Sequence, residues 1–444
     1  MTDATSGGVP ASPSNSLLEQ DTRTRKRNAA EARFKIYGIV AIAVGLAFLV
    51  ILLTTIISNG TRAFTQTFLT MDIVLEQEAV DAAEASFVKT SKYREIITSQ
   101  LEAKIAEGGF DTPLTGAADL QQLLSAGAAG QLREFVLANP DRVGETVTFS
   151  FLTASRVDGY VKGRVTRESL ARDKNLSPVA LDLVDQLEDA GIVERTFNWA
   201  FILGADASES RPEQAGIGVS MIGSFFMMLV VLFLALPIGV AASIYLEEFA
   251  PQNRITDIIE VNISNLAAVP SIVFGILGLA AFIQFAHLPQ SAPLVGGLVL
   301  TLMTLPTIII STRASLKAVP PSIRDAALGL GASKMQSVFH HVLPLAMPGI
   351  LTGTIIGLAQ ALGETAPLLL IGMVGFIASN YPEGVASGFL DPNSAMPAQI
   401  FEWAKRADPA YYERAWGGII ILLLFLMTMN IIAIILRRRF ERRW

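Results

Sequence analysis

Long apolar runs constrain this chain more than any other feature of its sequence. A membrane-spanning helix needs about 20 predominantly apolar residues, and residues 36–57 meet that requirement. Only 17% of the 444 residues are charged, against about a quarter in a soluble domain. The sequence therefore predicts an all-α polytopic membrane protein with six transmembrane helices. We expect the five further spans at residues 217–246, 263–285, 293–312, 346–374 and 417–436.

The distribution of Lys and Arg predicts how these spans are oriented, because both residues are enriched in cytoplasmic loops. One basic cluster lies before the first span, in residues 23–35, and another follows the last span, in residues 437–443. The loop 313–345 between the fourth and fifth spans is also basic, whereas residues 286–292 hold no Lys or Arg. We therefore expect both termini and the loop 313–345 to be cytoplasmic, with the chain in an inner (cytoplasmic) membrane.

The segments outside the spans differ in composition. Residues 1–35 are expected to form a disordered, basic cytoplasmic tail, and residues 438–444 a short basic cytoplasmic end. Residues 58–215 carry charges throughout and are long enough to fold alone, which predicts an inserted periplasmic α+β domain. Within it the patterns indicate helices at 117–137 and from Pro178 to Gly191, with Ser177 as the N-cap, and strands at 147–152 and 193–203.

Glu364 is placed inside the fifth predicted span, between Gly363 and Thr365. An ionised carboxylate at bilayer depth costs about 2.5–3.5 kcal/mol on insertion scales. It therefore faces protein or water, and we expect a cationic partner. Two interpretations remain open: Glu364 lines or gates a translocation path, or it forms a structural pair with Lys or Arg of this or another subunit.

The basic loop 313–345 carries a second candidate site. Pro320, Pro321 and Ser322 predict the start of a short helix, and Gly331 permits the chain to turn after it. Its apolar face would suit a groove in a partner protein, or it would lie on the membrane surface. The residues of that face are expected to be Ile323, Ala326, Ala327 and Leu330.

Several chemistries are excluded by residues that the sequence lacks. The chain has no Cys and no phosphate-binding loop of the form GxxxxGK[S/T], so we expect no thiolate chemistry and no bound ATP. His340 and His341 are neighbours, and neighbours point about 100° apart on a helix, so they make a poor metal site. No catalytic triad or acid pair stands out. We therefore do not expect this chain to be an enzyme. We also expect no cofactor on this chain, no metal site and no nucleic-acid partner.

The loop resembles the EAA motif of bacterial ABC importer permeases. The matching positions have Asp325 in place of Glu and His341 in place of Ile. The resemblance implies a type I importer permease core over residues 216–437 and a coupling helix seated on a separate ATPase, which would hold ATP and Mg. The coupling residues that it implies are Asp325, Ala326, Ala327, Gly331, Leu343 and Pro344.

Residues 363–369, which read GETAPLL, resemble the signature of the PstA family of phosphate permeases. That family commonly has Arg four residues before the Glu, where this chain has Gln360. The resemblance implies an importer of inorganic phosphate, with partners of the PstC (permease), PstB (ATPase dimer) and PstS (periplasmic binding protein) types. It places Gln360, Glu364, Thr365 and Pro367 on the translocation path. Two alternatives remain: a permease for molybdate or sulfate, and a membrane-anchored sensor that uses residues 58–215.

Overall fold

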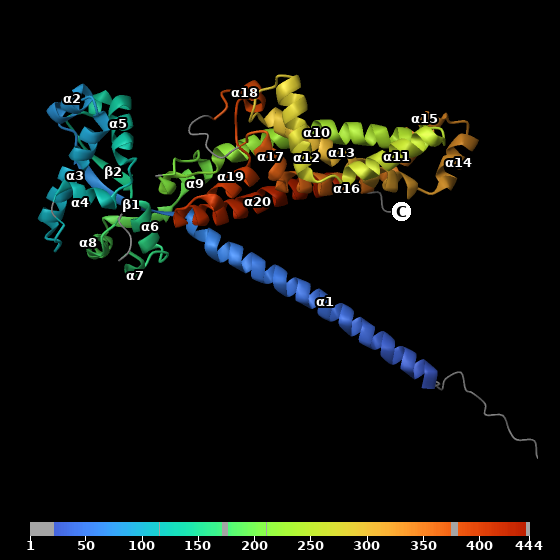
Figure 1. Ribbon diagram of the computed structural model, residues 1–444, viewed down its shortest axis with the longest axis horizontal. Helices are drawn as coiled ribbons and strands as arrows, with labels where there is room; N and C mark the ends of the chain where they lie inside the picture. Colours follow the sequence, from blue (N-terminus) through green and yellow to red (C-terminus); the bar gives the residue numbers. More distant parts are fainter. Residues whose placement is uncertain (1–21, 115, 171–175, 210, 374–380, 441–444) are drawn as a thin grey trace, which may run out of the picture. The chain divides into compact units, whose positions relative to one another are not determined.

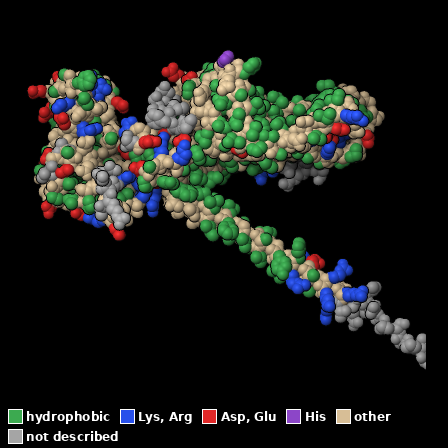
Figure 2. Space-filling view, in the orientation of Figure 1, with side chains coloured by type: hydrophobic (Ala, Val, Ile, Leu, Met, Phe, Trp, Pro, Cys, Tyr) green, Lys and Arg blue, Asp and Glu red, His purple; other side chains and the backbone are tan. Residues whose placement is uncertain are grey.

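The computed structural model describes residues 22–114, 116–170, 176–209, 211–373 and 381–440 (Figure 1). The chain divides into two compact units, Met1–Ile56 and Ile57–Trp444. Helix α1 (Thr22–Gly60) accounts for every described residue of the first unit, so the expected disorder of the N-terminal tail is wrong for residues 22–35. Its basic side chains lie in its first turns, and its apolar side chains are exposed along the apolar stretch (Figure 2). Such a helix is suited to lipid surroundings.

Five helices in the described residues are long and apolar enough to cross a membrane. Besides α1 they are built on α10 (Gly218–Ile244), α13 (Pro293–Lys317), α16 (Leu343–Gly363) and α20 (Pro409–Phe440). A π-helical turn, Tyr245–Phe249, extends α10, and another, Val338–Val342, precedes α16. These helices account for five of the six predicted spans.

The expected third span, 263–285, is not one straight helix. Helix α11 (Arg254–Ala267) and helix α12 (Ser271–Gly278), with its π-helical extension Leu279–Phe285, are bent by 101° at the break between them. The break ends at Pro270, which has no backbone N–H and disfavours helical backbone in the residue before it. The pair is therefore a broken span or a re-entrant loop.

The expected fifth span, 346–374, is also wrong as a single helix. Helix α16 ends at Gly363, and the short helix α17 (Ala366–Leu370) starts after two non-helical residues. In a continuous helix the ring of Pro367 would clash with the carbonyl of Gly363, four residues earlier. Residue 374 lies outside the described residues. Glu364 is consequently in the break and not in the middle of a helix.

Helix α13 packs between α10 and α16 at the centre of the bundle. Gly297 of α13 shows how closely these helices approach, because a Cβ atom there would lie 2.4 Å from Cβ of Val230 on α10. Small residues at such contacts allow helices to pack in lipid without a hydrophobic driving force between them. The outer surface of the bundle is largely apolar (Figure 2).

Residues 65–197 form an α+β unit, here called the α+β domain. Its three antiparallel strands, in the order β2-β1-β3, are β1 (Thr65–Val74), β2 (Thr146–Leu152) and β3 (Val193–Phe197). The side chains of its core come from the sheet and from the helices packed on it, which contribute Tyr93, Leu101, Leu132 and Leu183 among others. The longer of these helices are α2 (Gln77–Ala85), α3 (Lys89–Gly108), α5 (Ala128–Ala138), α6 (Ser155–Val161) and α8 (Pro178–Asp189).

The local predictions for this region have mixed outcomes. Strand β2 and the start of α8 at Pro178 are confirmed, although the hydroxyl of Ser177 caps nothing. The predicted helix 117–137 is wrong, since α4 (Ala117–Leu120) and a 3₁₀ turn are separated from α5. The predicted strand 193–203 ends at Phe197, because Asn198 accepts a hydrogen bond from the N–H of Phe201 and starts α9 (Trp199–Leu203).

Candidate coupling surface and translocation path

The loop after α13 forms the short helix that its prolines predict. Helix α14 (Pro321–Gly329) begins directly after Pro320, and Gly331 follows it with a φ of 88°. Left-handed backbone of this kind costs other residues roughly 1–2 kcal/mol, so this position favours glycine. Ser333 then caps α15 (Lys334–Ser337) through a capping box with Gln336. The predicted helix and turn are therefore confirmed.

The predicted apolar face of α14 is divided between the protein interior and the surface. Ala327 is 7% exposed, and Ile323 packs against the core cluster that holds Leu316 and Val342. Ala326 is exposed, and Leu330 is 91% exposed. Positions four apart share a face of a helix, so Ile323 and Ala327 hold α14 on its own chain. Ala326 and Leu330, with Asp325, remain available to another protein.

Helix α14 is fastened to the end of α10 by a charge pair. Nη2 of Arg324 lies 2.6 Å from Oε1 of Glu248, and its Nε also donates to that carboxylate. The same guanidinium donates to the carbonyls of Val319 and Leu316 at the end of α13. The side chain of Glu248 is 7% exposed and that of Arg324 is 22% exposed. A charge-assisted, multidentate arrangement of this type fixes orientation as well as distance.

A second charged group continues the contact toward α11. Arg313 of α13 donates to Glu247, at 3.3 Å, and to Glu260 of α11, at 2.6 Å. Lys317 lies 3.6 Å from Glu247. We call Glu247, Glu248, Glu260, Arg313 and Arg324 the α14 anchor. It joins α14 to the end of α10, and Arg313 of α13 links this contact to α11.

In the sequence, Arg313, Lys317 and Arg324 belong to the basic loop that indicates topology, and the anchor is not evident from them. A signal was present, because Glu247 and Glu248 directly follow an apolar run and are expected at the same membrane face as the basic loop. Which carboxylate meets which cation depends on helix packing and could not be inferred from that signal.

The remaining motif positions lead into α16. His340 and His341 are exposed in the π-helical turn, Leu343 is half-buried at the start of α16, and Pro344 is exposed. The implied path residues lie at the other end of the same helix. With a rise of 1.5 Å per residue, the two ends of α16 are about 30 Å apart. The structure therefore places the predicted residues in two separate sites.

The second site is built around the break between α16 and α17. Glu364 has extended backbone and Thr365 directly precedes α17; both are half-buried, whereas Gln360 is exposed on α16. Pro367 is buried against α12, where a Cβ atom at Gly275 would lie 2.7 Å from Cα of Pro367. Two broken helices thus meet here. Non-helical backbone at membrane depth is tolerated only against protein or a water-filled path.

The expected cationic partner of Glu364 is not found within the parts of the chain that the structure describes, where its side chain makes no ion pair. In the same residues no group of three or more His, Cys, Asp or Glu side chains could hold a metal ion.

Comparisons with known protein families match two regions of the chain. Residues 235–444 match the family described as "Binding-protein-dependent transport system inner membrane component", and residues 21–171 match a domain of unknown function, DUF3333. The phosphate transport system permease protein PstA 1 of Mycobacterium tuberculosis is 31% identical over 52% of this chain and 74% of its own length. PstA of Haemophilus influenzae is 30% identical over 49% of this chain and 74% of its own length. The probable ABC transporter permease protein YqgI of Bacillus subtilis is 29% identical over 49% of this chain and 76% of its own length.

Among solved structures, the MetNI methionine ABC transporter in an inward-facing conformation aligns with 50% of this chain and 97% of its own chain, at 15% identity and a TM-score of 0.39. The sequence relatives define the class: a membrane-embedded permease of an ABC transporter, which is a transport subunit and not an enzyme. Within that class the chain belongs to the PstA-type family of phosphate transport permeases.

Proposed function

We propose that this chain is the permease subunit of an ATP-driven importer of inorganic phosphate and forms half of its translocation pathway. The observation that carries the proposal is the α14 anchor, which connects an exposed EAA-type helix directly to the end of α10 and to the carbonyls at the end of α13, and through Arg313 to α11. The 31% identity with a phosphate transport permease supports the substrate. A PstC-like permease, a PstB-like ATPase dimer carrying ATP and Mg, and a PstS-like binding protein complete the assembly.

The proposed topology has six spans, with the bent pair α11 and α12 counted as one. The N-terminal tail 1–35, the loop 313–345 and the end 438–444 are cytoplasmic, and residues 58–215 are periplasmic. Two observations support this. The helices α14 and α15 and the α+β domain lie at opposite ends of the helical bundle (Figure 1), and Lys and Arg are concentrated in the segments placed inside.

The anchor suggests how movement of the ATPases reaches the path. ATP binding would draw the two ATPases together and shift α14, and the pair of Arg324 with Glu248 transmits that shift to α10. Like charges repel, so Glu364 does not hold phosphate directly. It instead sets the position of the break between α16 and α17 or pairs with a cation on the partner permease, since Gln360 supplies no charge.

The first test is uptake of radiolabelled phosphate at low concentration by cells that lack the gene, with and without the chain restored. Restored uptake supports the proposal. If phosphate uptake does not depend on the chain, whereas molybdate or sulfate uptake does, the chain serves another oxyanion. Dependence of none of the three, in a chain that purifies without an ATPase, would favour a membrane-anchored sensor.

The anchor is tested by reversing its charges. Arg324→Glu places two carboxylates in contact and should lower uptake by tenfold or more, about 1.4 kcal/mol of coupling free energy or above. The exchanged pair, Arg324→Glu with Glu248→Arg, should recover part of that loss. Glu145→Arg, which reverses one charge of an exposed pair outside the anchor, is the control for a reversed charge and should leave uptake unchanged. Uptake by Arg324→Glu equal to that of the parent chain would contradict a role in transmission.

Glu364→Gln tests the path. It should impair uptake while the complex still assembles, because the amide keeps the size of the side chain and removes its charge. Gln360→Arg, which restores the cation common in the family, should raise uptake or leave it unchanged. Uptake by Glu364→Gln equal to that of the parent chain would exclude Glu364 from the path.

A further inference from the structure

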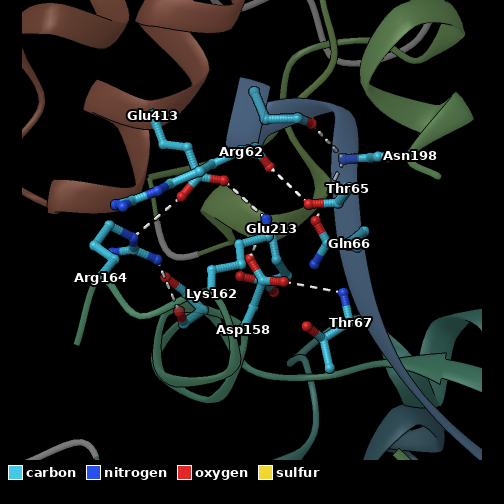
Figure 3. Close-up of polar contacts among 12 residues, drawn as sticks. Arg62, Thr65, Gln66, Thr67, Asp158, Lys162, Arg164, Asn198, Glu213 and Glu413 are labelled. Carbon is cyan, nitrogen blue, oxygen red and sulfur yellow. Dashed lines mark hydrogen bonds and ion pairs between the residues drawn. The ribbon is translucent and has the colours of Figure 1, made fainter. Parts of the chain in front are cut away.

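A buried cluster of charges joins the α+β domain to the last membrane helix (Figure 3). Nζ of Lys162, which follows α6, lies 2.8 Å from Oε1 of Glu413 on α20 and 2.7 Å from Oδ2 of Asp158. The other carboxylate oxygen of Asp158 accepts from the N–H of Thr67 in β1, and Arg164 donates to Glu413 at 3.2 Å. A continuous polar chain therefore runs from the sheet to α20.

These charges are withdrawn from water to an unusual degree. The side chain of Lys162 is 0% exposed, that of Asp158 4% and that of Glu413 5%. Acidic and basic side chains are almost never fully buried unless they are paired. Each member here has a partner of opposite charge, so the arrangement is a built one and not an accident of a crowded surface.

Arg414, the next residue of α20, makes a second connection. Its guanidinium donates to the carbonyl of Ala63 at 3.0 Å and to Oε1 of Gln66 at 2.6 Å, both on the segment that enters the domain. It also donates to the carbonyl of Glu213, at 3.1 Å, on the segment that leaves the domain for α10. One buried side chain thus holds the entry, the exit and α20 together. We call Asp158, Lys162, Arg164, Glu413 and Arg414 the domain junction.

The segments on either side of the junction are tied down as well. Asp206, after α9, pairs with Arg406 at 2.6 Å and accepts a hydrogen bond from Nε1 of the buried Trp403. Arg156 pairs with Asp408 at 2.9 Å, directly before α20. Two covalent connections alone would leave a domain free to change its orientation, which is the default for small interfaces. Here the ion pairs to Glu413, the hydrogen bond from Arg414 to Gln66 and the pair of Arg156 with Asp408 fix its orientation.

The buried ion pairs of the junction affect the orientation of the domain more than its stability. A buried ion pair is weak support for high stability, because desolvation offsets much of the Coulomb attraction. Its effect is on orientation: any rotation of the domain away from α20 would leave buried charges unpaired, and this is strongly unfavourable. The junction therefore resists relative movement more than it raises stability.

We propose that Lys162, Glu413 and Arg414 are positioning residues that lock the α+β domain to the first turns of α20, so that the two move as one rigid body during transport. The inference rests on the proposed importer function only for its consequence: movement of α20 is carried to the outer surface of the domain, and a protein bound to that surface biases α20. No function has been assigned to the matched domain family.

The test is a distance measurement in the assembled transporter. The natural chain has no Cys, so Glu102→Cys on α3 and Asp391→Cys, after α18 (Val385–Leu390) in the bundle, give two unique sites for spin labels. Both positions are exposed. Double electron–electron resonance between the two labels should give one narrow distance distribution in lipid nanodiscs. It should stay narrow when ATP with Mg is added, even if its centre moves.

Glu413→Gln should broaden the distribution and lower uptake while the subunits still copurify. Glu145→Gln, which breaks the exposed pair with Arg142, is the matched control. It should change neither the distance distribution nor uptake. Should Glu413→Gln fail to reach the membrane, Arg164→Gln leaves Glu413 paired with Lys162 and should broaden the distribution less. A broad distribution in the parent chain, or an unchanged one in a folded junction variant, overturns the proposal. The distances need no substrate, so failure of phosphate uptake alone would refute only the importer function.

Discussion

The α14 anchor and the domain junction both attach a segment to a membrane helix through charged pairs, but they differ in exposure to water. Each fastens a segment outside the membrane helices to the end of a long helix with an Arg or Lys paired to a Glu. The pair in the junction is 0% and 5% exposed, whereas the pair in the anchor is 22% and 7% exposed. Water can replace a lost partner at the anchor, but it cannot at the junction. The difference suggests that the anchor is built to adjust and the junction to stay fixed.

The direct comparison is between Glu413→Gln and Glu248→Gln. Removing one partner from a fully buried pair costs about 3–5 kcal/mol, whereas Arg324, which is 22% exposed and can reach water, loses about 1–3 kcal/mol when Glu248 is removed. The junction variant should therefore have the lower apparent unfolding temperature in the same detergent. Equal decreases for the two variants would remove the distinction between a fixed and an adjustable contact.

Glycines at the end of α14 give a more local test of the anchor. Gly331→Ala should destabilise the loop by roughly 1–2 kcal/mol, because its φ is 88°. Gly329→Ala is the matched control: both positions have open space around a Cβ atom, but Gly329 is helical, so alanine there should be neutral or stabilising. Uptake should fall for the first variant only. A loss of uptake in both would indicate that the surface of α14, and not its turn, is what the substitutions disturb.

How far the sequence predicts these regions depends on the distance over which each signal acts. The apolar runs, the start of α14 at Pro321 and the turn at Gly331 follow from local composition and backbone preference, and the structure has all of them. The bends after Ala267 and Gly363 required reading Pro270 and Pro367 as breaks and not as tolerated prolines.

The domain junction could not be predicted in this way. Lys162 and Glu413 are 251 residues apart, and in the sequence each is one charged residue among many. Nothing local distinguishes Lys162 from the exposed lysines of the same domain. Only the packing of α6 against the start of α20 brings the two charges together, and this packing is a property of the whole fold.

The smallest expected effect is the pH dependence of stability. It compares Glu84, whose ion pairs in the domain are partly exposed to water, with Glu213, a buried acid beside the junction. Hydrogen bonds from Arg133 and Lys89 lower the pKa of Glu84 to about 2, from an ordinary value of 4.5. A lowered pKa in the folded state means that the stabilisation is present above the ordinary value and is lost as the pH falls toward 2. Burial acts in the opposite direction on Glu213 and raises its pKa. The stabilisation from the protonated carboxyl is therefore present at low pH and is lost as the pH rises.

Two isosteric variants separate these effects in one experiment. Glu84→Gln should lower the apparent unfolding temperature near neutral pH and make it less sensitive to acid between about pH 5 and pH 3. Glu213→Gln should raise it slightly at neutral pH, because the variant avoids burying a charge, and the gain should vanish in acid. If Glu213→Gln instead destabilised the chain as much as Glu413→Gln, the ionised carboxylate of Glu213 would have to be counted within the junction. The cluster that fixes the domain would then be larger than its ion pairs, because it would include the carboxylate held by Ser125.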